Sequence, residues 1–545
     1  MKKHKQLTRL AVLTAVTFIS TAVIGEERRC YIKDGDRWAF YGDSITDAGV
    51  YAKAVERVFR HFHPNAKVTF INNGIGGKSA ARATAKEALR KNPNIVSIML
   101  GMNDAINSKW GKGMPVKPVI EAYRANMTRL VRNLKAAGKE VVLMTPTLTD
   151  ETISTSIFRL AGTEALLRQM GQVCEDIAKA EKIPCLPVQQ DFSRFQQRQS
   201  LAQERLRYDG VHPTAVGQYE IARIMWRRLN LAAPLSQGSR KLYPPMAELP
   251  LAAKAEQRIL PCSNRNIKVI FNTEKPLHAT LSWSLAGKSG KTKLKIAKDT
   301  CWTLPAPEIL PSTDGTGALG VIDAEDSKKR SIFLLDILRN PLLHMKNNQA
   351  SGQIKADGKV ICNYLFRKDG RGLYFKAGVI DDELSPRRNR NAWPWNGDNV
   401  TLYLDLRPNA RFGGSGMERD VFQVWFQPQT KYGYSPGFRI WYGKGLEHAG
   451  VPFGQKTADG YEVALLIDGY FSMQERFDIN KRDFIGFDMS VCDYSAAAKK
   501  SKWHSLKKTQ YPPFLYASGF TVVDLKNKLK DNSIYTVNIF PGSNQ

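Results

Sequence analysis

Three side chains of the kinds that form nucleophilic catalysts occur where they could meet in a folded chain. Residues 41–47 read Tyr-Gly-Asp-Ser-Ile-Thr-Asp, and Ser44 stands where an apolar run, residues 38–41, gives way to a helical pattern. A serine in that place lies at the C-terminal edge of a sheet, with its backbone N–H at the start of a helix. Unpaired N–H donors and the positive end of a helix dipole both favour an oxyanion there.

His212 is the candidate base. The chain has eight histidines, and only His212 has a carboxylate, that of Asp209, three residues before it. A turn of that length lets Asp209 accept a hydrogen bond from Nδ1, which leaves Nε2 free to take the proton of Ser44. The competing interpretation is that Asp209 caps a helix beginning near Thr214 and that His212 only fills space.

Two further polar segments follow apolar strands. Asn103 comes after the run 95–100 and could donate Nδ2–H to an oxyanion, although Asn-Asp sequences also form ordinary turns. Gly74, Gly76 and Gly77 follow the run 68–72 and would let the backbone approach a substrate closely; a flexible turn is the alternative. Because ligands of parallel sheets bind beyond the carboxyl ends of the strands, these groups are expected at one edge.

In this order the four segments resemble the blocks of the GDSL-type SGNH hydrolases, a family of esterases and lipases. The family is named for Ser, Gly, Asn and His, which match Ser44, Gly77, Asn103 and His212 here. The resemblance implies that Ser44 is the nucleophile and that His212, with Asp209, is the base. It also implies an oxyanion hole formed by the backbone N–H groups of Ser44 and Gly77 together with Asn103 Nδ2.

The resemblance covers about residues 35–232, and all four blocks are intact. Other hydrolytic sites fit less well, because the chain contains no Gly-x-Ser-x-Gly elbow, no His-Glu-x-x-His and no Cys-x-x-Cys. The glycines at 74–77 are followed by Lys78-Ser79, but the spacing from Gly74 to Gly77 is shorter than that of a phosphate loop. The sequence therefore predicts acyl transfer without a metal ion or another cofactor.

Short apolar runs alternate with helical patterns from residue 37 to residue 230. This alternation predicts an α/β fold, a doubly wound parallel sheet with flanking helices of the flavodoxin-like kind. The expected strands are residues 38–41, 68–72, 95–100, 140–145 and 183–187. The expected helices are residues 47–61, 79–90, 119–137, 164–180 and 215–229.

Composition changes on either side of this domain. A basic start followed by the apolar run 10–24 predicts a signal peptide over residues 1–25, and an uncleaved anchor is the alternative. Proline, serine and glycine residues mark a connector over residues 233–262. Short β-type runs then predict an immunoglobulin-like β domain at 263–340, the first of two expected β-sandwich domains.

The second β domain is expected at residues 345–525. Strand-like stretches at 371–382, 393–400, 460–464 and 485–493 resemble, in this order, the sandwich of family 9 carbohydrate-binding modules. The resemblance implies a sugar chain held on flat aromatic faces. The candidate platforms are Trp393, Trp395 and Trp441, with Trp425 and Trp503 in addition. Because most aromatic side chains of a sandwich belong to its core, at most two are expected to touch a ligand.

Cysteine spacing bears on the cellular compartment. The pairs Cys174/Cys185, Cys262/Cys301 and Cys362/Cys492 suggest disulfides formed in an oxidising compartment, and buried free thiols are the equal alternative. With the signal peptide, this pattern predicts a secreted or periplasmic protein that has no stable membrane span after cleavage. The aspartates at 381, 382, 398 and 493 could bind calcium, although turns are the commoner use of such residues.

Charge bears on the partner. The formal net charge is +29, which attracts polyanions, and the chain carries no recognisable nucleic-acid module. An acylated and anionic polysaccharide fits these observations, whereas a charge that serves solubility alone is equally plausible. The function expected first is therefore a secreted esterase that removes acetyl or other small acyl groups from a polysaccharide. A lipase acting on lipid esters and a glycan-binding protein with a vestigial hydrolase domain are the alternatives.

Overall fold

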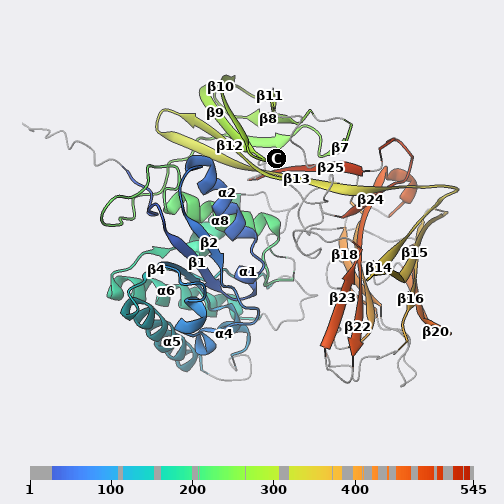
Figure 1. Ribbon diagram of the computed structural model, residues 1–545, viewed down its shortest axis with the longest axis horizontal. Coiled ribbons are helices and arrows are strands. Elements are labelled where there is room, and N and C mark those ends of the chain that lie inside the picture. Colours follow the sequence, from blue (N-terminus) through green and yellow to red (C-terminus); the bar gives the residue numbers. More distant parts are fainter. Residues whose placement is uncertain are drawn as a thin grey trace, which may run out of the picture.

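Figure 1 shows the fold in a computed structural model. It describes residues 28–108, 115–151, 161–198, 207, 209–263, 266–305, 318–370, 372–382, 397–407, 409, 420–426, 438–440, 450–467, 477–495, 500–506, 520–531 and 533–540. The expected signal peptide lies outside these residues. In the described part of the chain, no helix is both long enough and apolar enough to cross a membrane.

The N-terminal part is built on a parallel sheet of five strands. They are β1 (Arg37–Gly42), β2 (Thr69–Asn72), β3 (Ile95–Met99), β4 (Glu140–Met144) and β5 (Cys185–Leu186), in the order β2-β1-β3-β4-β5. The order reverses at β1, between β2 and β3, as in other doubly wound sheets. The predicted fold of this part is confirmed, and each expected strand is present within a few residues of its predicted bounds.

Helices lie on both faces of the sheet (Figure 1). They are α1 (Ser44–Asp47), α2 (Val50–Phe62), α3 (Ala85–Ala88), α4 (Met102–Ile106), α5 (Val116–Ala136), α6 (Thr163–Glu181), α7 (Val188–Arg198) and α8 (Ala215–Arg228). The expected helix at 47–61 is preceded by a separate turn, α1, because the chain breaks at Gly49, whose φ of 74° is left-handed. The expected helix at 79–90 is only a 3₁₀ turn (Ala80–Arg82) followed by α3.

Thr84 explains the second break. Its side chain accepts from Glu87 N while Glu87 reaches back to Thr84 N, a capping box that starts a new helix in the middle of the expected one. Sequence reasoning also missed α4 and α7, which are short or interrupted by polar residues. The consequence for the site is that the segment after β2 is a loop with two short turns.

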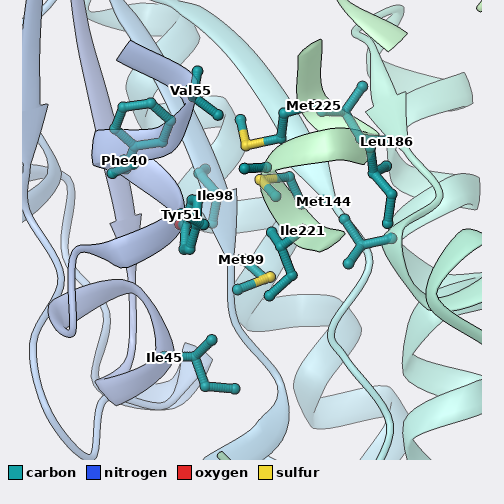
Figure 2. Close-up of a cluster of buried hydrophobic side chains, with 14 of the residues drawn as sticks. Phe40, Ile45, Tyr51, Val55, Ile98, Met99, Met144, Leu186, Ile221 and Met225 are labelled. Carbon is teal, nitrogen blue, oxygen red and sulfur yellow. The ribbon is translucent and has the colours of Figure 1, made fainter. Parts of the chain in front are cut away.

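One layer of the core of this part lies between the sheet and the helices α2 and α8, and the helices α5 and α6 bury side chains in the same core. Figure 2 shows side chains from both helices meeting those of the central strands, and all ten labelled residues are buried. Those residues are Phe40, Ile45, Tyr51, Val55, Ile98, Met99, Met144, Leu186, Ile221 and Met225. Residues 215–226 of α8 are all buried, so other parts of the chain must cover the face that α8 turns away from the sheet.

The rest of the chain is almost entirely β-structure. Its strands are β6 (Ala252–Ala255), β7 (Ile259–Pro261), β8 (Lys268–Asn272), β9 (Leu277–Leu285), β10 (Lys288–Ile296), β11 (Thr300–Thr303), β12 (Ala318–Asp326), β13 (Lys329–His344), β14 (Gln349–Ala356), β15 (Lys359–Asp369), β16 (Gly372–Ile380), β17 (Asn399–Asp405), β18 (Val421–Phe426), β19 (Phe438–Ile440), β20 (Gly450–Thr457), β21 (Gly460–Ile467), β22 (Phe484–Ser495), β23 (Lys500–Ser505), β24 (Thr521–Asp524) and β25 (Ser533–Phe540).

These strands form three sheets and enclose two separate hydrophobic cores, consistent with two β-sandwich domains. The connector expected at 233–262 contains β6 and β7, which pair with β8 and β25. The long strand β13 joins the two regions, because its first part pairs with β12 and its last residues pair with β24. The final strand, β25, returns from the C-terminal region to pair with β13 beside the N-terminal domain (Figure 1).

Several contacts join the N-terminal domain to this β-structure, and two of them involve α8 and the end of α2. The ring of Phe540 at the end of β25 lies 4.5 Å, centroid to centroid, from the ring of Tyr219 on α8. At the other contact, His61 at the end of α2 makes hydrogen bonds of 2.7 and 3.2 Å through its two ring nitrogens with Ser284 and Ser282 of β9. Strand β25 therefore covers part of the face that α8 turns away from the sheet.

All seven cysteines lie in the described part of the chain and are free thiols. The suggested bridges are therefore not formed, and the alternative of free thiols holds. For one pair the reason is plain, because Cys362 faces the core of the last sandwich whereas Cys492 follows the core residue Val491 and points to the opposite face of its own sheet. Within the described residues, no three His, Cys, Asp or Glu side chains group as a metal site, so the four aspartates considered for calcium do not form one.

Candidate active site

Ser44 is the first residue of α1, directly after β1. The turn is tight, since a side-chain carbon at Gly42 would lie 2.2 Å from Thr46 Oγ1 and 2.6 Å from the carbonyl oxygen of Met99. Asp43 caps the turn, and its Oδ1 accepts from Ile45 N at 2.9 Å. Only glycine at position 42 therefore lets the chain turn here and present the hydroxyl of Ser44 at the edge of the sheet.

The structure brings Ser44, His212 and Asp209 together in one line of hydrogen bonds. Ser44 Oγ lies 2.8 Å from His212 Nε2, and His212 Nδ1 lies 2.7 Å from Asp209 Oδ2. Asp209 Oδ1 also accepts from the backbone N–H groups of Val211 and His212. Both oxygens of the carboxylate are thus engaged, so the ring of His212 is held by its own turn with one nitrogen aimed at Ser44.

The charges around His212 raise the pKa of its imidazole. Burial lowers the pKa of its imidazole, but the charge and the hydrogen bond of Asp209 together with the charge of Asp43 outweigh burial, and the net pKa lies above the ordinary 6.5. The His212 side chain is 22% exposed and that of Asp209 7% exposed. An imidazole in this setting can accept a proton from Ser44 and hold the positive charge that results.

The glycine loop and Asn103 lie beside one another. Asn103 Nδ2 donates to the carbonyl oxygen of Lys78 at 3.0 Å, and Asp104 Oδ2 accepts from Ala80 N at 2.9 Å. These two bonds tie the loop after β2 to α4, which follows β3. A primary amide carries two N–H groups, so the bond to Lys78 orients Asn103 and uses one of them.

Within that loop the glycines have different tasks. A side chain at Gly74 would collide with the backbone of Asp47, whose nitrogen would lie 2.2 Å from the added carbon. Gly77 has open space in that direction but a left-handed φ of 69°, which other residues adopt only with strain. Gly74 thus brings the loop against α1, and Gly77 gives the next peptide its direction.

Sequence reasoning did not single out Asp43. Its side chain is 2% exposed, and burial raises its pKa to about 6, although the bond from Ile45 N and the charge of His212 lower that pKa. The signal was available, because aspartate directly before a helix start is a common capping residue. Asp43 therefore serves both as the cap of the Ser44 turn and as a second carboxylate near His212.

The expected sugar platforms Trp393, Trp395 and Trp441 lie outside the described residues. Of the two further candidates, Trp425 on β18 is buried, whereas Trp503 on β23 is 42% exposed. Their rings meet edge to face with centroids 5.9 Å apart. The structure therefore assigns Trp425 to packing and leaves Trp503 as an accessible aromatic side chain.

Comparison with known families decides the kind of domain. Residues 40–219 match the family described as GDSL-like Lipase/Acylhydrolase. This part of the chain is a GDSL-like lipase/acylhydrolase domain. The resemblance to this family is thereby confirmed over residues 40–219, and the GDSL-like domain is a carboxylic ester hydrolase. The roles given to single residues of the four blocks stay predictions. The resemblance of the last β domain to family 9 carbohydrate-binding modules stays a prediction.

Solved structures similar to this chain include two hydrolases. One is a catalytic mutant of Axe2, an acetylxylan esterase from Geobacillus stearothermophilus, with 23% identity over 38% of this chain and 100% of that chain and a TM-score of 0.32. Another is LAE5, an alpha/beta hydrolase enzyme from the metagenome of Lake Arreo, Spain, with 21% identity over 37% of this chain and 99% of that chain and a TM-score of 0.32. No curated protein matches the chain.

Proposed function

We propose that the GDSL-like domain removes acetyl or other small acyl groups from a polysaccharide, through an acyl-enzyme formed on Ser44. The observation that carries the proposal is the pair of short hydrogen bonds, 2.8 Å from Ser44 to His212 and 2.7 Å from His212 to Asp209. Distances of this kind are those at which a hydroxyl, a general base and an orienting carboxylate act as one unit.

In the proposed reaction, Ser44 Oγ attacks the ester carbonyl while His212 Nε2 takes the hydroxyl proton. The tetrahedral intermediate collapses, His212 gives that proton to the departing sugar oxygen, and the acyl group stays on Ser44. Water then attacks the acyl-enzyme with the same imidazole as its base. The bond between the acyl carbon and Ser44 Oγ breaks, His212 returns the proton to Oγ, and the carboxylic acid leaves. Asp209 keeps its charge throughout and stabilises the imidazolium of His212.

Three donors are proposed for the oxyanion, namely the backbone N–H groups of Ser44 and Gly77 and the second N–H of Asn103. Support comes from the contacts that join their segments, since Gly74 packs on α1 and Asn103 bonds the carbonyl of Lys78 next to Gly77. Donors fixed in advance at the site of a developing negative charge stabilise it without reorganisation.

The choice of a polysaccharide outside the cytoplasm rests on other parts of the chain. The basic and apolar start predicts export, the net charge of +29 favours an anionic polymer, and the last β domain resembles sugar-binding modules. Trp503 offers an exposed ring of the sort that stacks on sugars. A lipase is the second candidate, because the family that residues 40–219 match includes lipases.

The test is acetate release from a panel of acetylated polysaccharides, with acetylated xylan included and long-chain fatty esters as comparison. The proposal expects acetate release by the full chain and little hydrolysis of the long-chain esters. A preference for long acyl chains would assign the domain to lipid esters instead. Glycan binding without turnover of any ester would identify a binding protein.

The rate of ester hydrolysis should rise with pH through the pKa of His212, because only the neutral imidazole can accept the proton of Ser44. Since that pKa is raised, the acid limb of kcat/KM should have its midpoint above the ordinary 6.5. In Asp209→Asn the limb should move to lower pH, because the charge and hydrogen bond that raise the pKa are lost, and the plateau should fall by about four orders of magnitude.

A pH profile of p-nitrophenyl acetate hydrolysis measures both effects. Asp191→Asn is the matched control, because Asp191 is also buried but pairs with Arg228, away from His212. Its acid limb should stay where it is in the wild type. A limb in Asp209→Asn identical to that of the wild type would contradict the role given to Asp209.

A further inference from the structure

Gln218 connects the helix behind the base to the turn behind the nucleophile. It lies in the first turn of α8, six residues after His212, and its side chain is 1% exposed. Its Nε2 donates to the carbonyl oxygen of Ile45 at 3.1 Å, and its Oε1 accepts from Tyr51 N at 3.3 Å. Ile45 follows Ser44 directly, and Tyr51 is the second residue of α2.

The two bonds of Gln218 satisfy backbone groups near Ser44 that have no hydrogen-bond partner within their own helices. The carbonyl of Ile45 lies in the single turn of α1, where the last carbonyls have no partner within the helix. The N–H of Tyr51 lies in the first turn of α2, and the residue before that helix, Gly49, has no side chain to cap it. One carboxamide from α8 therefore serves the end of α1 and the start of α2 together.

The chemistry of the side chain is specific. Binding a carbonyl oxygen and an N–H at once requires a donor and an acceptor on one planar group, which only a carboxamide supplies at this length. A glutamate could accept from Tyr51 but could not donate to Ile45 while ionised, and a methionine could do neither. The roles of the two bonds can therefore be separated by substitution.

The position of Gln218 also matters for His212. Between the two residues lies one capping turn, in which Thr214 Oγ1 accepts from Gly217 N at 3.3 Å. The ring of His212 is fixed to Asp209 in the same short segment. A shift of α8 relative to α1 would therefore change the distance between Ser44 Oγ and His212 Nε2, which belong to segments 168 residues apart in the sequence.

We propose that Gln218 is a positioning residue that holds the nucleophile turn and the base segment at hydrogen-bonding distance, without touching the substrate. This inference rests on the proposed function, since it concerns the reactivity of Ser44. Losing the two hydrogen bonds of Gln218 should lower kcat, because misplacing reacting groups by about 1 Å costs about a hundredfold in rate. The KM should change little, because the side chain of Gln218 is 1% exposed and a substrate cannot reach it.

The experiment compares Gln218→Met and Gln218→Glu with the wild type and with Gln189→Met. Gln189 is a buried glutamine of the same domain whose amide donates to the carbonyl of Leu167, so its loss removes a similar bond away from Ser44 and His212. The readouts are kcat and KM for p-nitrophenyl acetate and the rate at which an aryl phosphonate labels Ser44. All three are measured well below the unfolding temperature of each variant.

The inference expects kcat and the labelling rate to fall together in Gln218→Met, by about ten- to a hundredfold, with Gln189→Met close to the wild type. Gln218→Glu should lose rate as well, although the Tyr51 amide stays protected from hydrogen exchange. Rates in Gln218→Met equal to those of Gln189→Met would make Gln218 a packing residue only and overturn the inference. A wild type inert to both reagents would instead overturn the proposed function, and this inference with it.

Discussion

Replacing Ser44 with alanine should abolish ester hydrolysis while leaving the fold unchanged. Ser44 Oγ makes a hydrogen bond with His212 Nε2, whereas the turn that carries Ser44 is capped by Asp43. Loss of the Ser44 hydroxyl therefore removes the nucleophile and leaves the turn intact. Loss of a nucleophile of this kind lowers kcat by about four to six orders of magnitude, since only the oxyanion donors and substrate binding still assist water.

The measurement is p-nitrophenyl acetate turnover by purified Ser44→Ala protein, with circular dichroism and the thermal midpoint as checks of folding. Ser108→Ala is the matched control, because the hydroxyl of Ser108 donates to the carbonyl of Ala105 at 2.8 Å in the same domain, a local bond within one turn. That variant should retain full activity. Activity of Ser44→Ala at more than about a hundredth of the wild-type rate would point to a different nucleophile.

Replacing Phe540 with alanine should destabilise the GDSL-like domain, although residue 540 lies far outside it in sequence. The Phe540 ring is 4% exposed and packs 4.5 Å from the ring of Tyr219 on α8. Truncating a buried phenylalanine costs about 3–5 kcal/mol, because apolar surface is lost and a cavity remains. Here the cavity would open between β25 and the helix that follows His212, so esterase activity should be lost at a lower temperature.

The measurement is the urea or temperature midpoint at which esterase activity disappears, since the chain has several domains and a single free energy of unfolding is not defined. Ile380→Ala is the control, because Ile380 on β16 is 51% exposed and its truncation should shift stability by less than about 0.5 kcal/mol. Equal midpoints for the two variants would mean that β25 does not support α8.

The parallel sheet was predictable because its strands are short, apolar and separated by helical patterns, which is a local signal. The helix breaks were predictable only in part. Gly49 and the Thr84–Glu87 capping box are visible in the sequence, but they lie within patterns whose apolar spacing continues through them. The position of β25 was not predictable, because the pairing of Leu335 with Ile539 joins residues with more than two hundred others between them.

Some residues of the candidate site could likewise be predicted from the sequence, and others could not. Ser44, Asp209 and His212 could be chosen from residue type and spacing, because a short turn fixes the relation of Asp209 to His212. Asp43 could have been predicted as a capping residue, because it stands directly before a helix start. Gln218 could not, because a buried glutamine in a helix has no signature of its own and its partners, Ile45 and Tyr51, come from another part of the chain. Contacts of that kind follow from packing alone.

The most direct test of the central claim is to find which residue an aryl phosphonate labels. The reagent forms a stable bond with a serine only where a base activates the hydroxyl, and peptide mapping by mass spectrometry then locates it. Labelling of the wild type at Ser44, much slower labelling of His212→Ala and none in Ser44→Ala are the predicted results. Labelling at any other residue, or ester hydrolysis that continues after complete labelling of Ser44, would contradict the account.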